Sequence, residues 1–204
     1  MVGYRRNLLG PPYGTSGWDS KRHVAHQGMV SRLLGGVTSG APRRQHSSLV
    51  TPLMQLRPFR SSDLETLSAI DRSCFPASVA YSRQELESFI TQPDSRTWVA
   101  VEGDTVLGFL VADRRSKDVG HVITIDVLEA WRRRGVGNQL MAAVEHWAET
   151  LALRLIYLET AENNVAAQRF YEARGYRRAK MLHDYYANGA AAWVMVKRLD
   201  EGPR

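Results

Sequence analysis

The pattern of hydrophobic and polar positions from Met54 onward alternates between two kinds of segment. Some runs are short and rich in β-branched residues, as strands are, while others place apolar residues three or four positions apart, as helices do. We expect seven strands, at 54–59, 97–101, 105–112, 121–127, 154–160, 176–181 and 192–199, and four helices, at 62–73, 82–91, 136–150 and 165–173. This order predicts a mixed α/β fold in which helices cover both faces of one sheet.

Three of the predicted helices begin with capping signals. Ser62 with Glu65, and Ser82 with Glu85, have the spacing of a capping box, in which each side chain accepts a backbone hydrogen bond from the other residue. Asn164 is a third candidate cap, ahead of the helix expected at 165–173. These residues predict where three of the four helices start.

Charge divides the chain at about residue 53. Residues 1–53 hold seven Lys or Arg and one acid, a net charge of +6, whereas residues 54–204 hold twenty basic and twenty acidic residues. The excess charge therefore belongs to the N-terminal segment. Nucleic-acid binding is not expected except through that basic segment.

The N-terminal segment, residues 1–53, is rich in Gly, Pro, Ser and His without any period, and we expect a disordered tail ahead of a domain at 54–200. An Arg-rich, acid-poor N-terminus is also typical of organelle transit peptides. A start site read too far upstream is a further interpretation. Whether the tail is a targeting segment, a functional tail or such an artefact stays open, although the core is expected to form without it.

Cysteine content and hydropathy bear on the compartment. The single cysteine, Cys74, cannot form an intrachain disulfide and fits a reducing compartment, so a cytoplasmic protein is expected. No run of residues reaches the roughly 20 apolar positions that cross a bilayer, so no membrane partner is expected.

The most informative segment is Arg132-Arg133-Arg134-Gly135-Val136-Gly137, between a predicted strand and a predicted helix. The N-terminus of a helix presents unpaired N–H groups and a partial positive charge, and glycines allow an anion to approach them. The segment therefore predicts a pyrophosphate-binding loop. It lacks the Lys-Ser/Thr of a Walker loop, and Leu140 replaces the third glycine of a dinucleotide fingerprint. A basic surface turn before a core helix is the alternative.

The spacing Arg132-x-x-Gly135-x-Gly137 resembles motif A of the GNAT acetyltransferases, which holds the pyrophosphate of acetyl-CoA. Within that superfamily, the chain looks like the RimI-like N-terminal acetyltransferases of ribosomal proteins over nearly all of 54–200. The strings that carry this resemblance are Cys74-Phe75-Pro76 with Tyr81-Ser82, Gly120-His121-Val122, Asn164 to Tyr176, and Tyr185-Tyr186 with Asn188-Gly189. The resemblance implies a GNAT fold of about seven strands and four helices, acetyl-CoA as cosubstrate, and no metal.

The chain departs from the family at two places. Glu129 stands where most relatives have a proline that stiffens the loop. Ala190-Ala191-Ala192 follows Asn188-Gly189, where relatives usually have an acid in the peptide site. The second departure weakens the expectation of RimI-type substrate choice.

The resemblance assigns the reacting groups. Glu159 would act as general base through a water molecule, and Tyr171, twelve positions later as in RimI-like enzymes, would protonate the departing thiolate. The alternatives are a solvated strand acid for Glu159 and a core aromatic for Tyr171. Cys74 is not expected to be a nucleophile, because no Cys-His-acid arrangement accompanies it, so the amine would attack the thioester directly.

The same motifs imply the cofactor site. A backbone N–H of Val127 or Leu128 would face the oxyanion, and Asn164 would reach the pantetheine arm. Of the three arginines, only Arg132 holds the motif position. The full set of expected acetyl-CoA contacts is Val127, Leu128, Arg132, Arg133, Arg134, Gly135, Val136, Gly137, Asn138, Asn164 and Tyr171.

The acceptor site is expected to contain Phe75, Pro76, Tyr81, His121 and Tyr185. His121 could instead share the duty of the base, or be a buried, hydrogen-bonded strand histidine. The expected acceptor is the α-amine of a protein or peptide, which for RimI-like enzymes is a ribosomal protein. The alternatives are a small-molecule amine or lysine side chain, and a noncatalytic acyl-CoA-binding or RNA-associated module.

Overall fold

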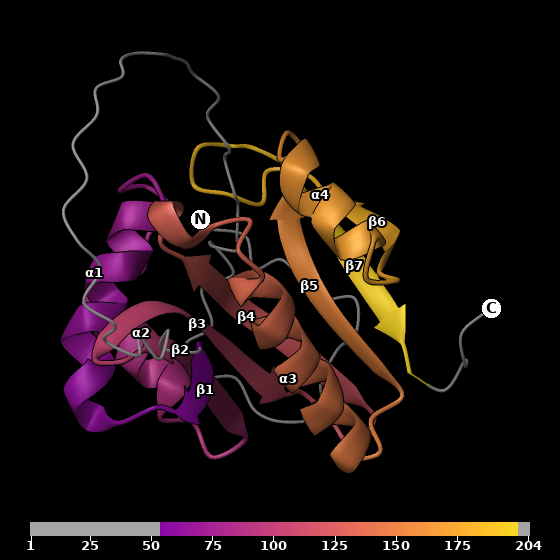
Figure 1. Ribbon diagram of the computed structural model, residues 1–204. Helices are drawn as coiled ribbons and strands as arrows, with labels where there is room; N and C mark the ends of the chain where they lie inside the picture. Colours follow the sequence, from indigo (N-terminus) through magenta and orange to yellow (C-terminus); the bar gives the residue numbers. More distant parts are fainter. Residues whose placement is uncertain (1–53, 200–204) are drawn as a thin grey trace, which may run out of the picture.

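The computed structural model describes residues 54–199, which form one mixed sheet with helices on both faces, as the sequence predicted (Figure 1). The N-terminal tail expected at 1–53 lies outside the described residues. The strands are β1 (Gln55–Pro58), β2 (Ser95–Glu102), β3 (Thr105–Arg114), β4 (Val119–Val127), β5 (Leu155–Ala161), β6 (Arg177–Leu182) and β7 (Ala192–Arg198). The helices are α1 (Leu64–Cys74), α2 (Arg83–Ile90), α3 (Val136–Thr150) and α4 (Val165–Glu172), with 3₁₀ turns η1 (Ser61–Asp63) and η2 (Glu129–Trp131).

The strand order across the sheet is β1-β2-β3-β4-β5-β7-β6. Every neighbouring pair is antiparallel except β4 and β5, which run parallel. A parallel pair needs a crossover connection, and α3 supplies it between the end of β4 and the start of β5. The C-terminal ends of β4 and β5 therefore lie at the same edge of the sheet.

Two apolar clusters fasten the helices to the sheet. Leu140 of α3 and Tyr171 of α4 belong to the cluster on one face. Leu67 of α1 and Leu86 of α2 belong to the cluster on the other face. Fully burying one leucine side chain is worth about 1.5–3 kcal/mol, so these clusters hold all four helices in place.

β4 and β5 separate soon after they begin to pair. Their pairing is restricted to Val119–His121 with Leu155–Tyr157, although β4 continues to Val127 and β5 to Ala161. In the pairing of β4 with β3, Ile123 has no partner residue, because Val111 pairs with Thr124 and Ala112 with Val122. This unpaired residue makes a β-bulge in β4. A bulge bends its strand, so the C-terminal halves of the two strands diverge and leave a gap in the sheet.

Two of the predicted helix caps are confirmed. Ser82 Oγ accepts the N–H of Glu85 at 3.2 Å, and the Glu85 carboxylate accepts the N–H of Ser82 at 2.8 Å. Asn164 Oδ1 accepts the N–H of Ala167 at 3.1 Å at the start of α4. The start of each helix is thus held by side chains that the spacing had indicated.

The capping box predicted at Ser62 is wrong. The buried carboxylate of Asp63 accepts two hydrogen bonds from the Arg57 guanidinium, at 2.7 and 2.8 Å, and a third from the Arg60 N–H at 2.8 Å. The chain makes a 3₁₀ turn around this ion pair, and α1 begins only after it. The salt bridge, rather than a serine hydroxyl, therefore sets the helix start.

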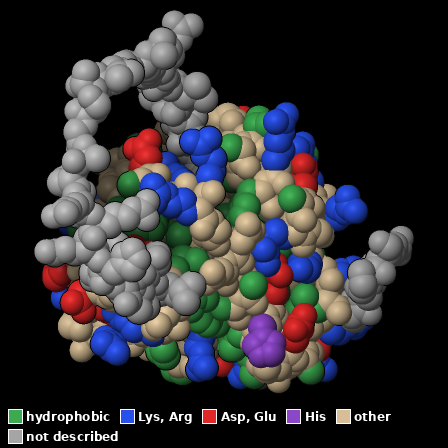
Figure 2. All heavy atoms as spheres, viewed as in Figure 1, with side chains coloured by type: hydrophobic (Ala, Val, Ile, Leu, Met, Phe, Trp, Pro, Cys, Tyr) green, Lys and Arg blue, Asp and Glu red, His purple; other side chains and the backbone are tan. Residues whose placement is uncertain are grey.

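The surface agrees with the charge pattern of the sequence. On the face shown in Figure 2, Lys and Arg side chains are interspersed with acidic, polar and apolar ones. Within residues 54–199, none of the helices has the length and apolar character needed to cross a membrane.

Replacing Gly108 by alanine is expected to lower the free energy of unfolding by about 1–3 kcal/mol, the usual cost of overpacking. The new Cβ would overlap the carbonyl oxygen of Asp126 and lie 3.0 Å from Val127 Cα, both backbone atoms of β4. Urea unfolding measures the change. Gly120→Ala is the control, since the closest atom to its Cβ would be the movable end of the Leu153 side chain, at 3.1 Å, and no backbone atom is among the nearest. Equal losses in the two variants would contradict the prediction.

Candidate active site

The loop between β4 and α3 has the geometry of an anion site. Gly135 is the N-cap of α3 and has a φ of +89°, a left-handed conformation that glycine adopts without strain. No side chain of the described residues caps this end, and the first helical hydrogen bond runs from the Gln139 N–H to Gly135 O at 3.0 Å. The N–H groups of the first turn therefore precede any intrahelical partner, as phosphate binding requires.

The second glycine of the loop lies beside α4. A Cβ on Gly137 would lie 3.4 Å from Phe170 Cζ, an ordinary van der Waals distance, so packing against α4 does not itself require glycine here. Arg133 and Arg134 are exposed, and the Arg134 guanidinium lies 5.1 Å from the ring centroid of Trp131. The loop thus joins the two helices that cover this face of the sheet.

Arg132 differs from the two arginines that follow it. Its Nε donates to the carbonyl oxygen of Val127 at 3.0 Å, and its Nη2 lies 3.6 Å from Cys74 Sγ. The sequence had suggested a pyrophosphate contact for this side chain. That contact stays a prediction, and in the structure two of the Arg132 nitrogens contact the end of β4 and the end of α1.

The structure separates the two candidate oxyanion donors. The Leu128 N–H donates to Leu107 O of β3 at 2.9 Å, so the prediction that it faces the gap is wrong. Successive residues of a strand direct their backbone groups to opposite sides. The N–H of Val127 is consequently directed away from β3, toward the gap between β4 and β5.

Glu159 is buried and hydrogen-bonded, so the alternative of a solvated strand acid is wrong. Its Oε2 lies 3.0 Å from Nε2 of His121, a side chain with no exposed surface. The register explains the contact, because His121 pairs with Tyr157 and Glu159 follows two positions later on the same face of β5. The His121 and Tyr157 rings are stacked with centroids 4.4 Å apart.

Two further residues contact the other side of His121. They are Asp113, near the end of β3, and Arg115, in the turn that follows. Arg115 Nη2 lies 2.9 Å from His121 Nδ1, and Asp113 Oδ1 lies 3.5 Å from it. Because a guanidinium can only donate, neutral His121 carries its proton on Nε2 and directs it at Glu159. Burial lowers the pKa of His121, but Glu159 and Asp113 outweigh it and raise that pKa above 6.5.

Tyr171 is fully buried on α4, and its hydroxyl has no hydrogen-bond partner among residues 54–199. Its ring contacts Phe170 and Tyr176 edge-on, with centroids 5.3 and 5.9 Å away. Burial, followed by the charge of Asp126, raises the pKa of the phenol. The hydroxyl is therefore held in its protonated, donating form.

Acetyl-CoA fits these residues. Asn164, which also caps α4, has a buried Nδ2 that lacks a partner within the described chain, as does the Tyr171 hydroxyl. Buried polar groups are normally hydrogen-bonded, so both atoms indicate a polar ligand. Together with the open first turn of α3, they are the groups expected to meet a pantetheine arm, a thiol and a pyrophosphate.

Three buried or half-buried tyrosines on the acceptor side are affected by the charge of Glu159. Tyr81 packs edge-on against Phe89 at 5.0 Å, and Tyr185 packs edge-on against Tyr186 at 5.2 Å. Burial raises the pKa of Tyr81, Tyr185 and Tyr186, and the charge of Glu159 raises each of them further. The predicted residues Tyr81 and Tyr185 therefore lie near the candidate base, together with Tyr186.

The remaining acceptor-side predictions have mixed outcomes. Phe75 is buried, Pro76 is exposed, and His121 has no exposed surface, so His121 cannot line an open groove. The α1–α2 loop and the β6–β7 loop do meet, since Val79 packs against a small cluster that contains Tyr186 and Ala161. Residues from these two loops and from β5 thus border one site.

A pair of buried carboxyl groups was missed from the sequence. Asp71 Oδ2 accepts the Tyr81 N–H at 2.7 Å, and Asp126 Oδ2 accepts the Thr124 hydroxyl at 3.0 Å. Burial, and then the Asp71 charge, raise the pKa of Asp126 well above its ordinary value. The available signal was a lone acid at 126 inside the otherwise apolar end of β4.

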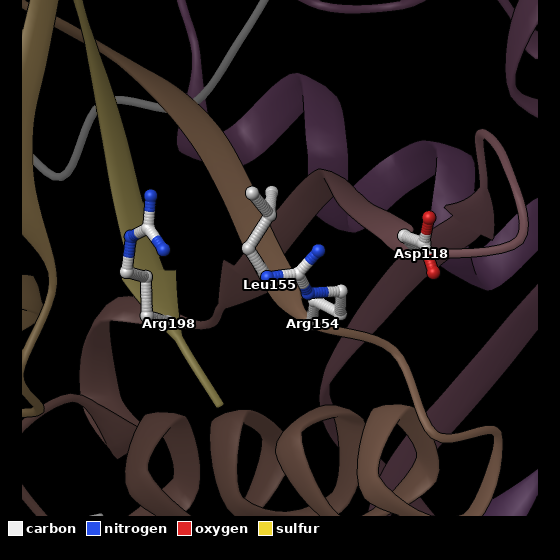
Figure 3. A pocket seen from close by; sticks show the side chains of 4 residues that line it. All are labelled: Asp118, Arg154, Leu155 and Arg198. Atoms are coloured by element: carbon white, nitrogen blue, oxygen red, sulfur yellow. The ribbon is translucent and has the colours of Figure 1, made fainter. Parts of the chain in front are cut away.

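A separate hollow lies at the start of β5, lined by Asp118, Arg154, Leu155 and Arg198 (Figure 3). It contains none of the residues predicted to act in catalysis or binding. Residues 54–199 contain no group of three or more His, Cys, Asp or Glu placed to hold a metal ion.

Comparison with known proteins agrees with this geometry. Residues 64–176 match the acetyltransferase (GNAT) family, which covers more than half of the chain. The chain belongs to this family, and it is an acetyltransferase by that membership.

Named relatives and solved structures extend the comparison. An uncharacterized N-acetyltransferase of Methanocaldococcus jannaschii is 31% identical over 146 residues, which are 71% of this chain and 92% of the relative. An N-alpha-acetyltransferase of Sulfurisphaera tokodaii is 28% identical over 155 residues, or 71% of this chain and 93% of the relative. The structure of Ard1 from Thermoplasma volcanium matches with a TM-score of 0.67 and 27% identity, and the match covers 72% of this chain and 99% of that one. Arabidopsis thaliana NAA60, solved with acetyl-CoA, shares the fold at a TM-score of 0.66 and 22% identity. This match covers 73% of this chain and 100% of that one.

We expect His121→Gln to change how stability depends on pH. The pKa of His121 is raised in the folded protein, so the folded state binds its proton more tightly than the unfolded chain does. This stabilisation is fully present below about pH 6.5 and is lost as the pH rises through the raised value. The difference in unfolding free energy between wild type and variant should therefore shrink with increasing pH.

Urea unfolding of both proteins between pH 5 and pH 9 measures that difference. His146→Gln is the matched control, because His146 is an exposed histidine on α3. A pH-independent difference for His121→Gln would refute the assignment.

Proposed function

We propose that this acetyltransferase transfers the acetyl group of acetyl-CoA to the α-amine of a protein or peptide N-terminus. The observation that carries the proposal is the position of Glu159, a buried carboxylate that hydrogen-bonds His121 and lies on β5 beyond the residues that pair with β4. The name N-alpha-acetyltransferase of the Sulfurisphaera relative supports the same acceptor.

The cosubstrate side follows from the loop and the gap. The first-turn N–H groups of α3 would hold the pyrophosphate, and Asn164 Nδ2 would donate to the pantetheine arm. The Val127 N–H would donate to the thioester oxygen, on which negative charge develops during attack. When bound, acetyl-CoA supplies the activated acetyl group at that point.

Glu159 is proposed to remove the proton of the attacking amine through a water molecule. A free α-amine has a pKa near 8, about two units below that of lysine, so only modest help is needed at neutral pH. The hydrogen bond from His121 Nε2 orients the Glu159 carboxylate. The base is thereby kept in one geometry inside a low-dielectric site.

Tyr171 is proposed to protonate the departing thiolate. Its raised pKa keeps the phenol protonated at physiological pH, and its hydroxyl lacks a competing partner within residues 54–199. A thiol has a pKa near 8.5. Its sulfur can accept the proton of Tyr171 only after it has left the acetyl group as a thiolate. Burial also raises the pKa of Cys74 to about 11, followed by the Asp126 charge, which favours direct attack over a cysteine intermediate.

The acceptor itself would enter from the side of Phe75, Tyr81 and Tyr185. Tyrosine rings offer apolar surface with one polar end, which suits the first residue and backbone of a peptide. The small side chains of Ala190–Ala192 replace the acid of RimI-like relatives. The ribosomal-protein substrate implied by that resemblance therefore stays a finer prediction.

The acceptor is tested with two peptides and acetyl-CoA. One has a free N-terminus and no lysine, while the other has a blocked N-terminus and one lysine. We expect acetylation of the first peptide only, located by mass spectrometry, with rates that vary with its first residue. Acetylation of the blocked peptide alone would show a lysine acetyltransferase, and labelling of neither would favour a small-molecule amine.

Glu159→Gln and Tyr171→Phe are each expected to lower kcat by about 10²- to 10⁴-fold, the usual contribution of general acid–base catalysis. Neither change removes a proposed pyrophosphate contact, so calorimetry should still detect coenzyme A binding. Tyr176→Phe is the matched control, since Tyr176 is another fully buried tyrosine whose ring contacts Tyr171. Wild-type turnover in either catalytic variant would refute its assigned role.

A further inference from the structure

We propose that Arg132 is a positioning residue for the thioester, and that its side chain does not bind the pyrophosphate. The inference rests on the proposed function, because it concerns the donor that faces the thioester oxygen. It assigns the first arginine of the loop to the chemistry at the end of β4.

The peptide unit between Val127 and Leu128 is held on both of its sides. Its oxygen accepts the Arg132 Nε–H at 3.0 Å, and Cys74 Sγ lies 3.5 Å from the same oxygen. Its N–H donates to Leu107 O at 2.9 Å. A peptide unit is planar, so fixing both groups fixes the orientation of the backbone at Val127.

That orientation matters for the neighbouring N–H. The N–H of Val127 belongs to the preceding peptide unit and is directed toward the gap between β4 and β5. No strand pairs with β4 on this side beyond His121 among residues 54–199, so the sheet itself does not hold the strand there. Arg132 therefore replaces, at this point, the restraint that a paired strand would give.

The guanidinium also brings positive charge to this end of the strand. Its charge lowers the pKa of both Cys74 and Asp126, although burial raises each of them more. A cation beside the Val127 peptide would favour negative charge on the thioester oxygen during attack. Position and charge thus act on the same reacting atom.

The two arginines that follow do not share these contacts. Arg133 and Arg134 are exposed, and Arg134 lies over Trp131. The first-turn N–H groups of α3 are sufficient for a pyrophosphate without any side chain. The loop therefore divides its tasks, with Arg132 facing β4 and the backbone after Gly135 facing the anion.

Two acyl donors separate a positioning role from phosphate binding. S-acetylpantetheine has the thioester and pantetheine arm of acetyl-CoA but lacks the pyrophosphate and nucleotide. We expect Arg132→Gln to lower kcat about 10- to 100-fold with either donor, as for small misplacements of a catalytic group, while the Kd for coenzyme A changes little. Arg132→Lys should restore part of the rate, and the exposed Arg96→Ala should match wild type.

Two further measurements do not depend on turnover. In the protein alone, Arg132→Gln should speed hydrogen exchange of the Leu128 amide, because the same peptide unit loses its partner at the oxygen. In the binary complex, the carbonyl stretch of ¹³C-labelled acetyl-CoA should lie below its value in solution for wild type and move back toward it in the variant.

Three results would overturn the inference. A variant that loses affinity for coenzyme A but turns over S-acetylpantetheine normally would make Arg132 a phosphate ligand. Tighter cofactor binding would show that Arg132 competes with the cofactor for Val127 O. Unchanged rate, exchange and carbonyl frequency would leave it no role at the thioester. Failure of the proposed function would give another result. The wild-type protein would then acetylate no α-amine, while the differences in hydrogen exchange and carbonyl frequency between wild type and Arg132→Gln would persist.

Discussion

The early separation of β4 from β5 is the constraint on which the rest of the structure depends. Three residue pairs join the two strands, and the bulge at Ile123 bends β4 away before the remainder can pair. The gap leaves the backbone of Val127 without a strand partner on that side among the described residues. Glu159, on the opposite strand, also lies beyond the last paired residues. A closed sheet would pair the Val127 N–H with β5 and leave it unable to donate elsewhere.

Buried charge around Glu159 is arranged by the register of three neighbouring strands. Asp113 on β3 pairs with His121 on β4, which in turn pairs with Tyr157 on β5. Ionisable groups are costly to bury unless they are paired. The alternating contacts of Arg115, Asp113, His121 and Glu159 offset that cost, and they also leave the Glu159 carboxylate in one orientation.

The sequence predicted the elements well because their signals are local. Strand alternation, helical spacing, the Ser82 box and the Asn164 cap are each confirmed within a few residues. The Ser62 box failed because Arg57, five positions earlier, bonds Asp63 instead. That salt bridge depends on how β1 leads into α1, which local spacing does not encode.

The candidate site was predicted in part, for a related reason. Family motifs identified Glu159, Tyr171 and the loop before α3 as separate residues along the chain. The contact of Glu159 with His121 depends on strand register, and the occupied N–H of Leu128 depends on pairing with β3. Both are properties of the sheet, so they could not be derived from one strand at a time.

The small cluster of Val79, Ala161 and Tyr186 has a consequence for the shape of any acceptor. It joins the loop after α1 to the loop before β7, across the end of β5. Under the proposed function, the acceptor would reach Glu159 beside this bridge. The interior of a polypeptide would have to pass the bridge on its way out, whereas a chain terminus would not, so the bridge would favour termini as acceptors.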